Sequence, residues 1–134
     1  DYYIAQEASL KLKEITYIHS EALAAGELKH GTLALIEDGT LVITLATQKA
    51  LMEKTISNIT ECRVRGAKVL SITFNDEPAL KKESDFVWTV PETLPEFAPV
   101  LAILPMQLFA YYVAVERNCD VDKPRNLAKS VTVE

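Results

Sequence analysis

Three charged side chains near the start of the chain have the types and the spacing that proton-transfer chemistry uses. Glu7, Lys11 and Glu14 are separated by four and three residues, so on a helix they share one face about one turn apart. An ammonium group between two carboxylates stabilises their ionised form, which is the form that a general base needs. The alternative is a solvated helix face with ordinary ion pairs.

A histidine offers a second group for acid–base chemistry. His30 lies in GELKHG between a lysine and a glycine, where an imidazole can be exposed and titrates near neutral pH. The alternative is a surface histidine without a chemical role. His19, the other histidine of the chain, falls within a helical stretch, where packing or a local hydrogen bond is expected.

The last twelve residues, KPRNLAKSVTVE, contain the third set of candidates. A lysine held in an apolar, partly closed site loses its proton readily and can attack a carbonyl to form a Schiff base, and Lys129 is the candidate for that role. Arg125 offers a planar fork for a phosphate or a carboxylate. The alternative is a basic, disordered terminus, because neither period nor composition distinguishes the two interpretations.

The first candidates lie on a stretch with a helical period. Residues 2–23 place an apolar stripe on one side and charge on the other, which predicts a helix. The glycines that follow predict a break near Gly26, a short helical turn and a connection that ends at Gly39. The apolar stripe consists of Ile4, Ala8, Leu12 and Ile15.

Strands alternate with helices in the rest of the chain. Short apolar runs at 41–46, 68–74 and 86–90 predict strands, and the first is typical of a strand that is buried on both faces. Strand, helix and strand with short connections predict a parallel sheet, which binds ligands at the carboxyl ends of its strands. No GxGxxG motif and no P-loop is present, so nucleotide-binding versions of this α/β architecture lack support.

The helix between the first two strands has recognisable ends. Thr47 is a plausible N-cap, and Gly66 is expected at the position just after the helix. The buried stripe of this helix is expected to consist of Leu51, Met52, Ile56 and Ile59.

An uncharged stretch over 97–115 is long enough to cross a bilayer. Pro99 and Pro105 would interrupt its hydrogen bonds, and Gln107 lies in its middle. In a soluble α/β protein such a helix is usually buried between a sheet and a neighbour. We therefore expect a core helix and no membrane association, and its apolar surface is also a candidate subunit interface.

Composition narrows the class of protein. The 134 residues are 49% hydrophobic and 25% charged, which fits one globular domain. A net charge of −5 without a basic cluster argues against nucleic acid as a partner. The cysteines Cys62 and Cys119 are too few for a disulfide framework, which favours a reducing, cytoplasmic setting. Neither lies in a metal-binding motif, so no metal site is expected.

Two long stretches resemble the sugar isomerase (SIS) domain family, and within it the glucosamine-6-phosphate synthases. EASLKLKEITYIHSEALAAGELKHGTLAL closely resembles the start of their second SIS subdomain, and DVDKPRNLAKSVTVE resembles their extreme C-terminus. The resemblance implies a three-layer αβα fold with a parallel sheet whose first strand is missing from this chain. It divides the chain into a truncated second SIS subdomain, 1–118, and a C-terminal active-site tail, 119–134.

The resemblance also implies a role for each candidate near the start of the chain. Glu14 matches the base that moves a proton between C1 and C2 of the sugar, and Lys11 and Glu7 match residues that assist it. His30 matches the histidine that helps to open the ring of fructose 6-phosphate, in the active site of the neighbouring subunit. Thr32 stands where the family usually has a proline, which could loosen the loop carrying His30.

For the tail, the resemblance implies that Lys129 forms a Schiff base with the open-chain ketose. Arg125 and Ala128 match residues of the wall of the sugar site. The whole reaction converts fructose 6-phosphate and glutamine-derived ammonia to glucosamine 6-phosphate, and it is that of a glutamine–fructose-6-phosphate transaminase (isomerizing). No cofactor is expected.

The resemblance implies partners outside this chain as well. We expect a fragment of a homodimeric enzyme that has a glutaminase domain and a first SIS subdomain before it, and that is inactive alone. Two alternatives remain: another SIS sugar-phosphate isomerase or deglycase, or a non-catalytic SIS module that senses sugar phosphates. The lysine-bearing tail argues against the first alternative, because those relatives need not end in this motif. The joint presence of Glu14, His30 and Lys129 argues against the second, because a sensing module has no need for all three.

Overall fold

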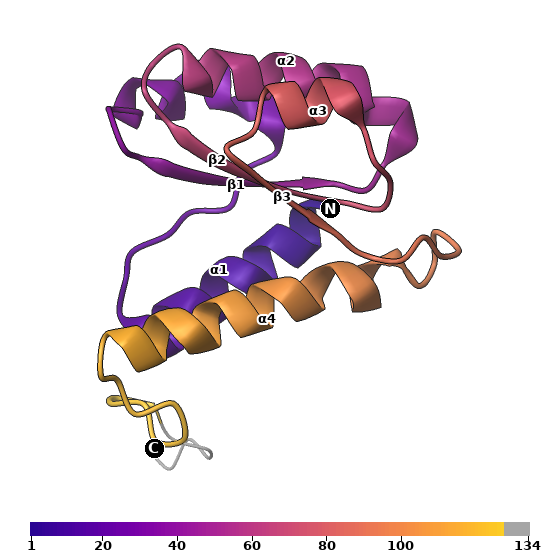
Figure 1. The fold of residues 1–134 in the computed structure, drawn as a ribbon. Coiled ribbons are helices and arrows are strands. Elements are labelled where there is room, and N and C mark those ends of the chain that lie inside the picture. Colours follow the sequence, from indigo (N-terminus) through magenta and orange to yellow (C-terminus); the bar gives the residue numbers. More distant parts are fainter. Residues whose placement is uncertain (128–134) are drawn as a thin grey trace.

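The computed structural model describes residues 1–127 and contains a three-stranded sheet between two layers of helices (Figure 1). The sheet is entirely parallel in the order β1-β2-β3, with Leu41 opposite Lys68 and Leu70 opposite Phe86. This confirms the predicted α/β fold. The elements in chain order are α1 (Tyr2–Thr16), the 3₁₀ helices η1 (Ala25–His30) and η2 (Thr32–Leu35), β1 (Leu41–Ala46), η3 (Lys49–Leu51), α2 (Met52–Arg63), β2 (Lys68–Thr73), α3 (Pro78–Lys82), β3 (Phe86–Thr89) and α4 (Ala98–Glu116).

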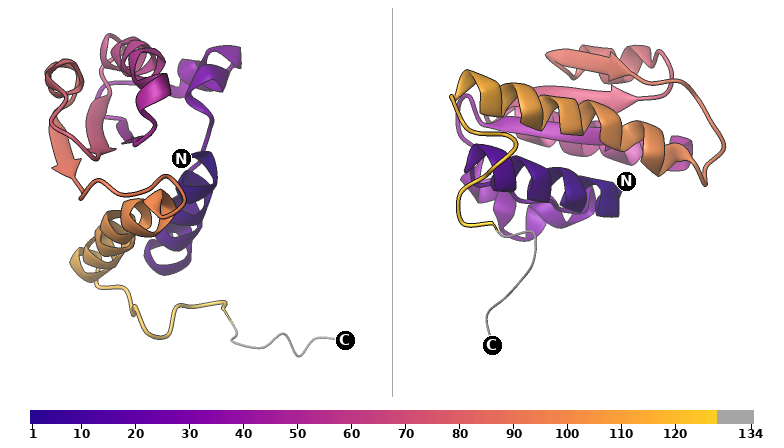
Figure 2. Two further views of the ribbon diagram at one scale, coloured as in Figure 1. Left: turned by 90° about the vertical axis from the view of Figure 1, so that its right-hand side faces the viewer. Right: turned by 90° about the horizontal axis from the view of Figure 1, so that it is seen from below.

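The two helical layers cover opposite faces of the sheet. Helices α2 and α3 lie on one face together with η1 and η2, and α1 and α4 lie side by side on the other (Figures 1 and 2). The central strand β2 supplies side chains to both layers, because successive residues of a strand point to opposite faces. Val69 packs on the α2 side with Ile59 and Leu80, whereas Ile72 packs on the other side with Ala8 and Met106.

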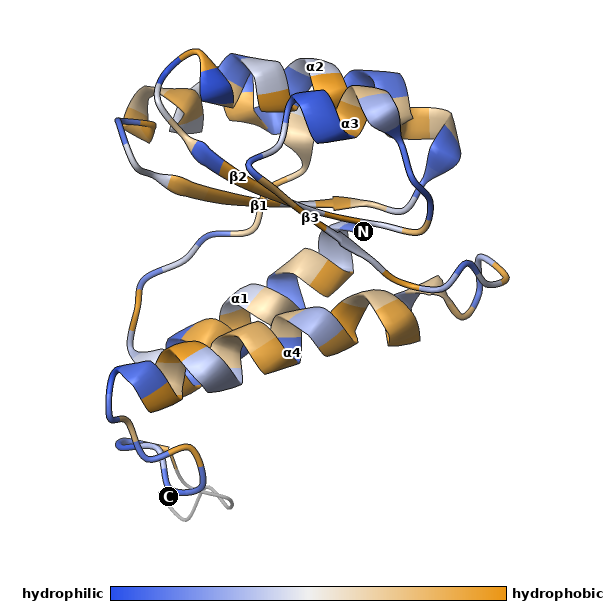
Figure 3. Ribbon diagram, viewed as in Figure 1, coloured by the Kyte–Doolittle hydropathy of each residue, from blue (hydrophilic) through white to orange (hydrophobic). Residues whose placement is uncertain are grey.

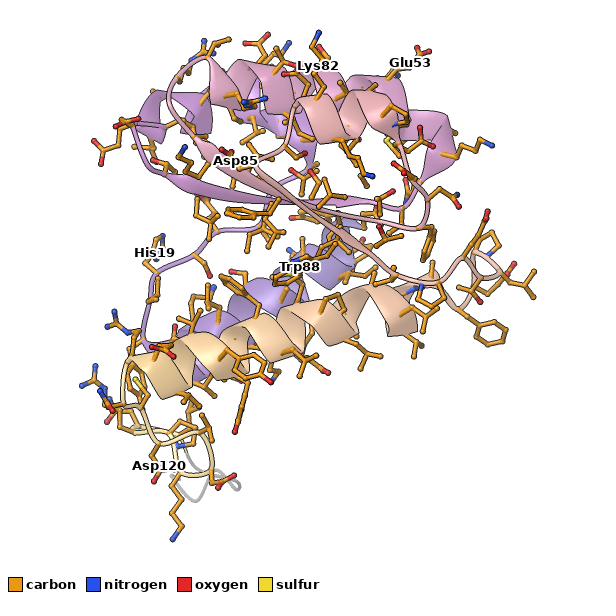
Figure 4. The ribbon with its side chains drawn as sticks, in the orientation of Figure 1. His19, Glu53, Lys82, Asp85, Trp88 and Asp120 are labelled. Atoms are coloured by element: carbon orange, nitrogen blue, oxygen red, sulfur yellow. The ribbon has the colours of Figure 1, made fainter. Side chains whose placement is uncertain are left out.

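Helix α1 is shorter than the helical period of the sequence. It ends at Thr16, where the period predicted a helix to residue 23, because Tyr17 adopts a left-handed conformation with φ 61°. The chain then turns back along the helix, and Ser9 and Ser20 exchange hydrogen bonds of 3.0 and 3.1 Å from side chain to main chain. His19 is consequently exposed in this connection (Figure 4), which corrects its expected place on a helix.

The connection between α1 and β1 also differs from the prediction. No break occurs at Gly26, which lies inside η1, and the change of direction is instead at Tyr17. Gly31 separates η1 from η2 with a φ of 142°, a conformation that only glycine adopts readily. The connection ends at Gly39 as predicted, with a φ of 84° at this glycine and β1 beginning at Leu41.

The ends of α2 are partly as predicted. Thr47 is not its N-cap: its hydroxyl and its N–H bind the carboxylate of Asp1, and η3 intervenes before the helix begins. Leu51, expected in the buried stripe, is 45% exposed. Gly66 does end the helix with a φ of 96°, and the N–H groups of Gly66 and Ala67 return to the helix as in a Schellman motif.

Helix α4 was predicted correctly in position but not in environment. It continues through Pro105, because proline removes a single backbone hydrogen bond and the remaining hydrogen bonds hold the helix together. It is not enclosed between a sheet and a neighbour: a stripe is buried, and large apolar residues are exposed elsewhere (Figure 3). By its length and composition alone, the helix is also long enough and apolar enough to cross a membrane. Its buried stripe is Ala102, Met106, Ala110 and Ala114.

The segment between β2 and β3 contains one short helix. Pro78–Lys82 forms α3, with proline in the first turn where its missing N–H is tolerated. Leu80 on this helix is fully buried against the α2 side of the sheet.

Candidate functional site

The row of charged side chains on α1 forms as its spacing predicts. The Nζ atom of Lys11 lies 2.7 Å from Oε2 of Glu14 and 3.6 Å from Oε1 of Glu7, so the ammonium joins both carboxylates. The Glu14 side chain is 26% exposed and the Glu7 side chain 45%, which makes Glu14 the more enclosed of the two. We call these three residues the α1 charge row.

The α1 charge row keeps its central group protonated. The hydrogen bond from Lys11 to Glu14 raises the pKa of Lys11 above its usual value, and the charges of Glu14 and Glu7 act in the same direction. Lys11 is therefore a cation at neutral pH and is unsuited to be a nucleophile or a base. Its hydrogen bond to Oε2 of Glu14 fixes the direction of that carboxylate.

The C-terminal segment returns to the end of α1. The helices α1 and α4 end on the same side of the molecule, so the chain that leaves α4 passes the last turn of α1 (Figures 1 and 2). Nε of Arg117 donates to the Thr16 carbonyl at 3.2 Å, and the backbone N–H of Arg125 donates to the Tyr17 hydroxyl at 2.9 Å. The structure thus brings Arg125 to the end of the helix that carries Glu14.

A turn at Asp120 gives the C-terminal segment its direction. One oxygen of this carboxylate accepts hydrogen bonds from the backbone N–H groups of Asp122 and Lys123, at 3.0 and 2.9 Å. Such a turn reverses the chain just after α4, where Asp120 is seen in Figure 4. Ala128 and Lys129, the other two candidates of the tail, lie outside the described residues.

The structure does not bring His30 to the α1 charge row of the same chain. His30 is exposed at the end of η1, and η1 lies on the α2 side of the sheet, where Lys29 forms a 3.1 Å ion pair with Glu61. The α1 charge row is on the helix that covers the other face of the sheet (Figures 1 and 2). An acid–base role for His30 next to Glu14 of its own chain is therefore excluded by this arrangement.

Two grooves lie elsewhere on the described residues. One, of about 440 Å³, follows the outer edge of β1 between the start of α1 and the η helices. The other, of about 570 Å³, is almost wholly apolar and lies beside Trp88 on the surface of α4. Neither is lined by the α1 charge row, by His30 or by Arg125. Within residues 1–127 no group of three or more potential metal ligands comes together.

Sequence reasoning missed Tyr17, the residue that contacts the tail. Its ring lies beneath the guanidinium of Arg125, with 4.1 Å between the Cζ atom and the ring centroid. No short motif marks such a contact, because its two partners are 108 residues apart. The only available signal is the closeness of Tyr17 to Glu14 along the chain.

Comparison with known proteins finds a family model and curated relatives that match this chain. The family model described as "SIS domain" matches residues 1–117. All 134 residues align at 60% identity with a protein of Clostridium tetani and at 61% with one of Caldanaerobacter subterraneus, both named glutamine--fructose-6-phosphate aminotransferase [isomerizing]. The chain spans 22% of the length of each of these relatives.

Two solved structures superpose on most of this chain. The C-terminal domain of the glucosamine-fructose-6-phosphate aminotransferase of Francisella tularensis superposes with a TM-score of 0.81 at 38% identity, over 91% of this chain and 34% of that one. A glucosamine-6-phosphate deaminase of Thermotoga maritima superposes with a TM-score of 0.76 at 27% identity, over 97% of this chain and 37% of that one.

Proposed function

This chain belongs to the SIS domain family, and we propose that it is the C-terminal isomerase segment of a glutamine–fructose-6-phosphate aminotransferase. The observation that carries the proposal is the α1 charge row, with Arg125 held at the end of the same helix. This places a fixed carboxylate and an anion-binding group on one side of the molecule, which is what an isomerase of phosphorylated sugars requires.

In the proposed reaction, Lys129 forms an imine with the carbonyl at C2 of open-chain fructose 6-phosphate, and one water molecule leaves. Ammonia from glutamine then replaces the lysine amine at C2 and regenerates the free side chain. Glu14 takes a proton from C1 and returns a proton to C2, which converts the 2-imino ketose to the 2-amino aldose without any oxidation or reduction. The product is glucosamine 6-phosphate.

The other residues of the α1 charge row support Glu14 in this mechanism. Lys11 is 2.7 Å from Glu14, so its cation stabilises the carboxylate before the proton is taken and fixes the direction of the carboxylate. Glu7 holds the other side of Lys11. Arg125 and Ala128 are proposed to form part of the wall of the sugar site, with the guanidinium facing anionic groups of the substrate.

We propose a homodimer in which His30 serves the site of the neighbouring subunit and opens the sugar ring there. Two features support it. His30 lies across the sheet from Glu14 of its own chain, so it would need a second chain in order to act beside a Glu14. The apolar side chains exposed on α4, such as Leu104, Leu108 and Tyr112, provide a surface suited to a subunit contact.

The proposal extends to the organisation of the whole protein. We divide the chain into an SIS subdomain, 1–118, and an active-site tail, 119–134, which agrees with the end of α4 at Glu116. The remainder of the enzyme is proposed to supply a glutaminase domain and a first SIS subdomain, because this chain spans 22% of its curated relatives. We propose a cytoplasmic location, which the free cysteines Cys62 and Cys119 support.

Activity measurements on the full-length protein test this function. Purified protein is given fructose 6-phosphate and glutamine, and glucosamine 6-phosphate is detected by mass spectrometry. The Lys129→Ala variant is expected to lose synthesis while keeping its thermal midpoint. Synthesis at the wild-type rate in Lys129→Ala would remove the Schiff-base assignment. A wild-type protein that only releases ammonia from glucosamine 6-phosphate, with no use of glutamine, would show that the enzyme is a deaminase instead.

A further inference from the structure

Tyr17 has an unusual backbone conformation at the end of the helix that carries Glu14. Its φ of 61° and ψ of 19° are left-handed, a region where glycine and asparagine are common and a bulky aromatic residue is rare. A residue of this kind persists only where its surroundings hold it, and such residues are concentrated at functional sites. The contacts of the Tyr17 side chain are therefore candidates for a functional role.

The turn at Tyr17 is held by residues on both sides of it. The Thr16 hydroxyl donates to the Leu12 carbonyl at 2.6 Å and accepts the Ile18 N–H at 3.2 Å, and Thr16 is fully buried. The exchange of hydrogen bonds between Ser9 and Ser20 then ties the returning chain to α1. These contacts fix the direction in which the Tyr17 ring leaves the helix.

The side chain of Tyr17 makes two different contacts with one residue of the C-terminal segment. Its hydroxyl accepts the backbone N–H of Arg125 at 2.9 Å, and its ring lies 4.1 Å from Cζ of the Arg125 guanidinium. The first contact fixes the main chain and the second is a cation–π interaction that fixes the side chain. We call the pair the Tyr17–Arg125 contact.

We propose that Tyr17 is a positioning residue for the reaction, which seats the C-terminal segment on the end of α1 within one helical turn of Glu14. Lys129 follows Arg125 by four residues, so its backbone is tethered within about 14 Å of Arg125. Anchoring Arg125 therefore restricts the search of the Lys129 amine to the neighbourhood of the α1 charge row. This inference rests on the proposed function, because it gives the anchor a role in that reaction.

The anchor itself is tested without any substrate, by limited proteolysis of the full-length protein. Trypsin cleaves after Arg125 and also after Lys129, whereas the bond after Lys123 is protected by Pro124, so mass spectrometry is used to follow the chain that ends at Arg125. Because the C-terminal segment must leave α1 before trypsin can cut it, the rate of cleavage reports the fraction of molecules in which this segment is detached from α1. Tyr17→Leu removes both contacts and should raise the rate of this cleavage about tenfold. Tyr17→Phe keeps the ring and should raise it about threefold.

Two further variants separate anchoring from a loss of helix stability. Tyr17→Gly suits the left-handed conformation, so it relieves backbone strain while it removes the ring. It should accelerate cleavage as much as Tyr17→Leu without lowering the thermal midpoint of the protein. Tyr3 is an 81% exposed tyrosine on the same helix, and Tyr3→Leu should leave the cleavage rate unchanged. Equal cleavage rates in wild type, Tyr17→Leu and Tyr17→Gly would overturn the proposal.

The role in the reaction is tested by steady-state kinetics of the same variants. If the open fraction rises about tenfold, to about half of the molecules, the docked fraction falls to about half, so Tyr17→Leu should lose about twofold in kcat, with a smaller change in KM for fructose 6-phosphate. Tyr17→Phe should recover most of this loss, and Tyr3→Leu should match wild type. Faster cleavage with an unchanged kcat would show an anchor that does not serve the reaction. A wild-type protein without any synthesis would refute the proposed function, while the proteolysis would still decide the anchor.

Discussion

Replacing Gly66 by alanine tests how closely the end of α2 is packed against the start of the sheet. The φ of Gly66 is 96°, and a Cβ atom there would lie 2.7 Å from the Cα of Asp38, a backbone atom that cannot rotate away. The carbonyl of Gly66 also accepts the N–H of Gly39 at 2.9 Å. Movement of this turn would therefore disturb the connection that leads into β1.

The magnitude follows from two costs. An alanine at positive φ costs about 1–2 kcal/mol. Displacing the backbone of Asp38 is expected to add about 1–2 kcal/mol, as other overpacked sites do. The Gly66→Ala chain should therefore lose about 2–4 kcal/mol of unfolding free energy, which corresponds to a fall in Tm on the order of 10 °C for a domain of this size.

Gly26→Ala is the matched control. A Cβ atom at Gly26 would meet no packing neighbour within 4 Å among residues 1–127, and Gly26 has no positive φ, so alanine should be neutral or stabilising by about 0.5 kcal/mol. Urea unfolding of both variants can be followed by circular dichroism and by the fluorescence of Trp88, which lies near Phe109. Free energies for Gly66→Ala and Gly26→Ala that agree within about 0.5 kcal/mol would refute the reasoning from packing.

Three further predictions follow from single contacts. The Val69 N–H donates to Asp85 at 2.8 Å and lowers the pKa of this carboxyl, so Asp85→Asn should destabilise the chain near neutral pH. The difference in unfolding free energy between this variant and wild type should shrink as pH falls below 4. Urea titrations at several pH values measure this difference. Leu80 is fully buried, so Leu80→Ala should cost about 2–5 kcal/mol by the same titration, and a cost under 1 kcal/mol would contradict its core position. Lys11→Met removes the cation 2.7 Å from Glu14 and should slow synthesis by the full-length enzyme about tenfold, with partial recovery in Lys11→Arg; an unchanged rate would argue against support of Glu14 by Lys11.

The strands were predictable because their composition alone identifies them. The β-branched run of β1 matches its observed bounds, and the runs assigned to β2 and β3 each extend one residue beyond theirs. Gly66 was also recognisable, because a helix that ends in a left-handed conformation favours glycine there. These features depend on a few neighbouring residues, so local reasoning is sufficient for them.

Features set by distant partners were not predictable. The helical period runs past Thr16, but the turn at Tyr17 is stabilised by Arg117 and Arg125, about a hundred residues later. Thr47 is a residue type that is common at N-caps, yet its hydroxyl binds Asp1, which lies 46 residues earlier in the chain. A helix that is apolar at nearly every position, such as α4, likewise gives no sign of which side is covered.

The candidate site also combines features that the local sequence predicts with features that it does not. The proximity of Glu7, Lys11 and Glu14 follows from spacing on one helix, and the structure confirms that proximity. The separation of His30 from this row depends on which face of the sheet each helix covers, which spacing does not reveal. The chemical roles of Glu14, His30 and Lys129 remain predictions that rest on the resemblance to the SIS family.

Chemical trapping of the imine tests the central claim most directly. Full-length protein is incubated with fructose 6-phosphate and borohydride, digested, and mapped by mass spectrometry. The proposed mechanism predicts a stable sugar-phosphate adduct on Lys129, formed in wild type and absent from Lys129→Ala. An adduct on another lysine, or turnover of fructose 6-phosphate with no adduct at all, would contradict it.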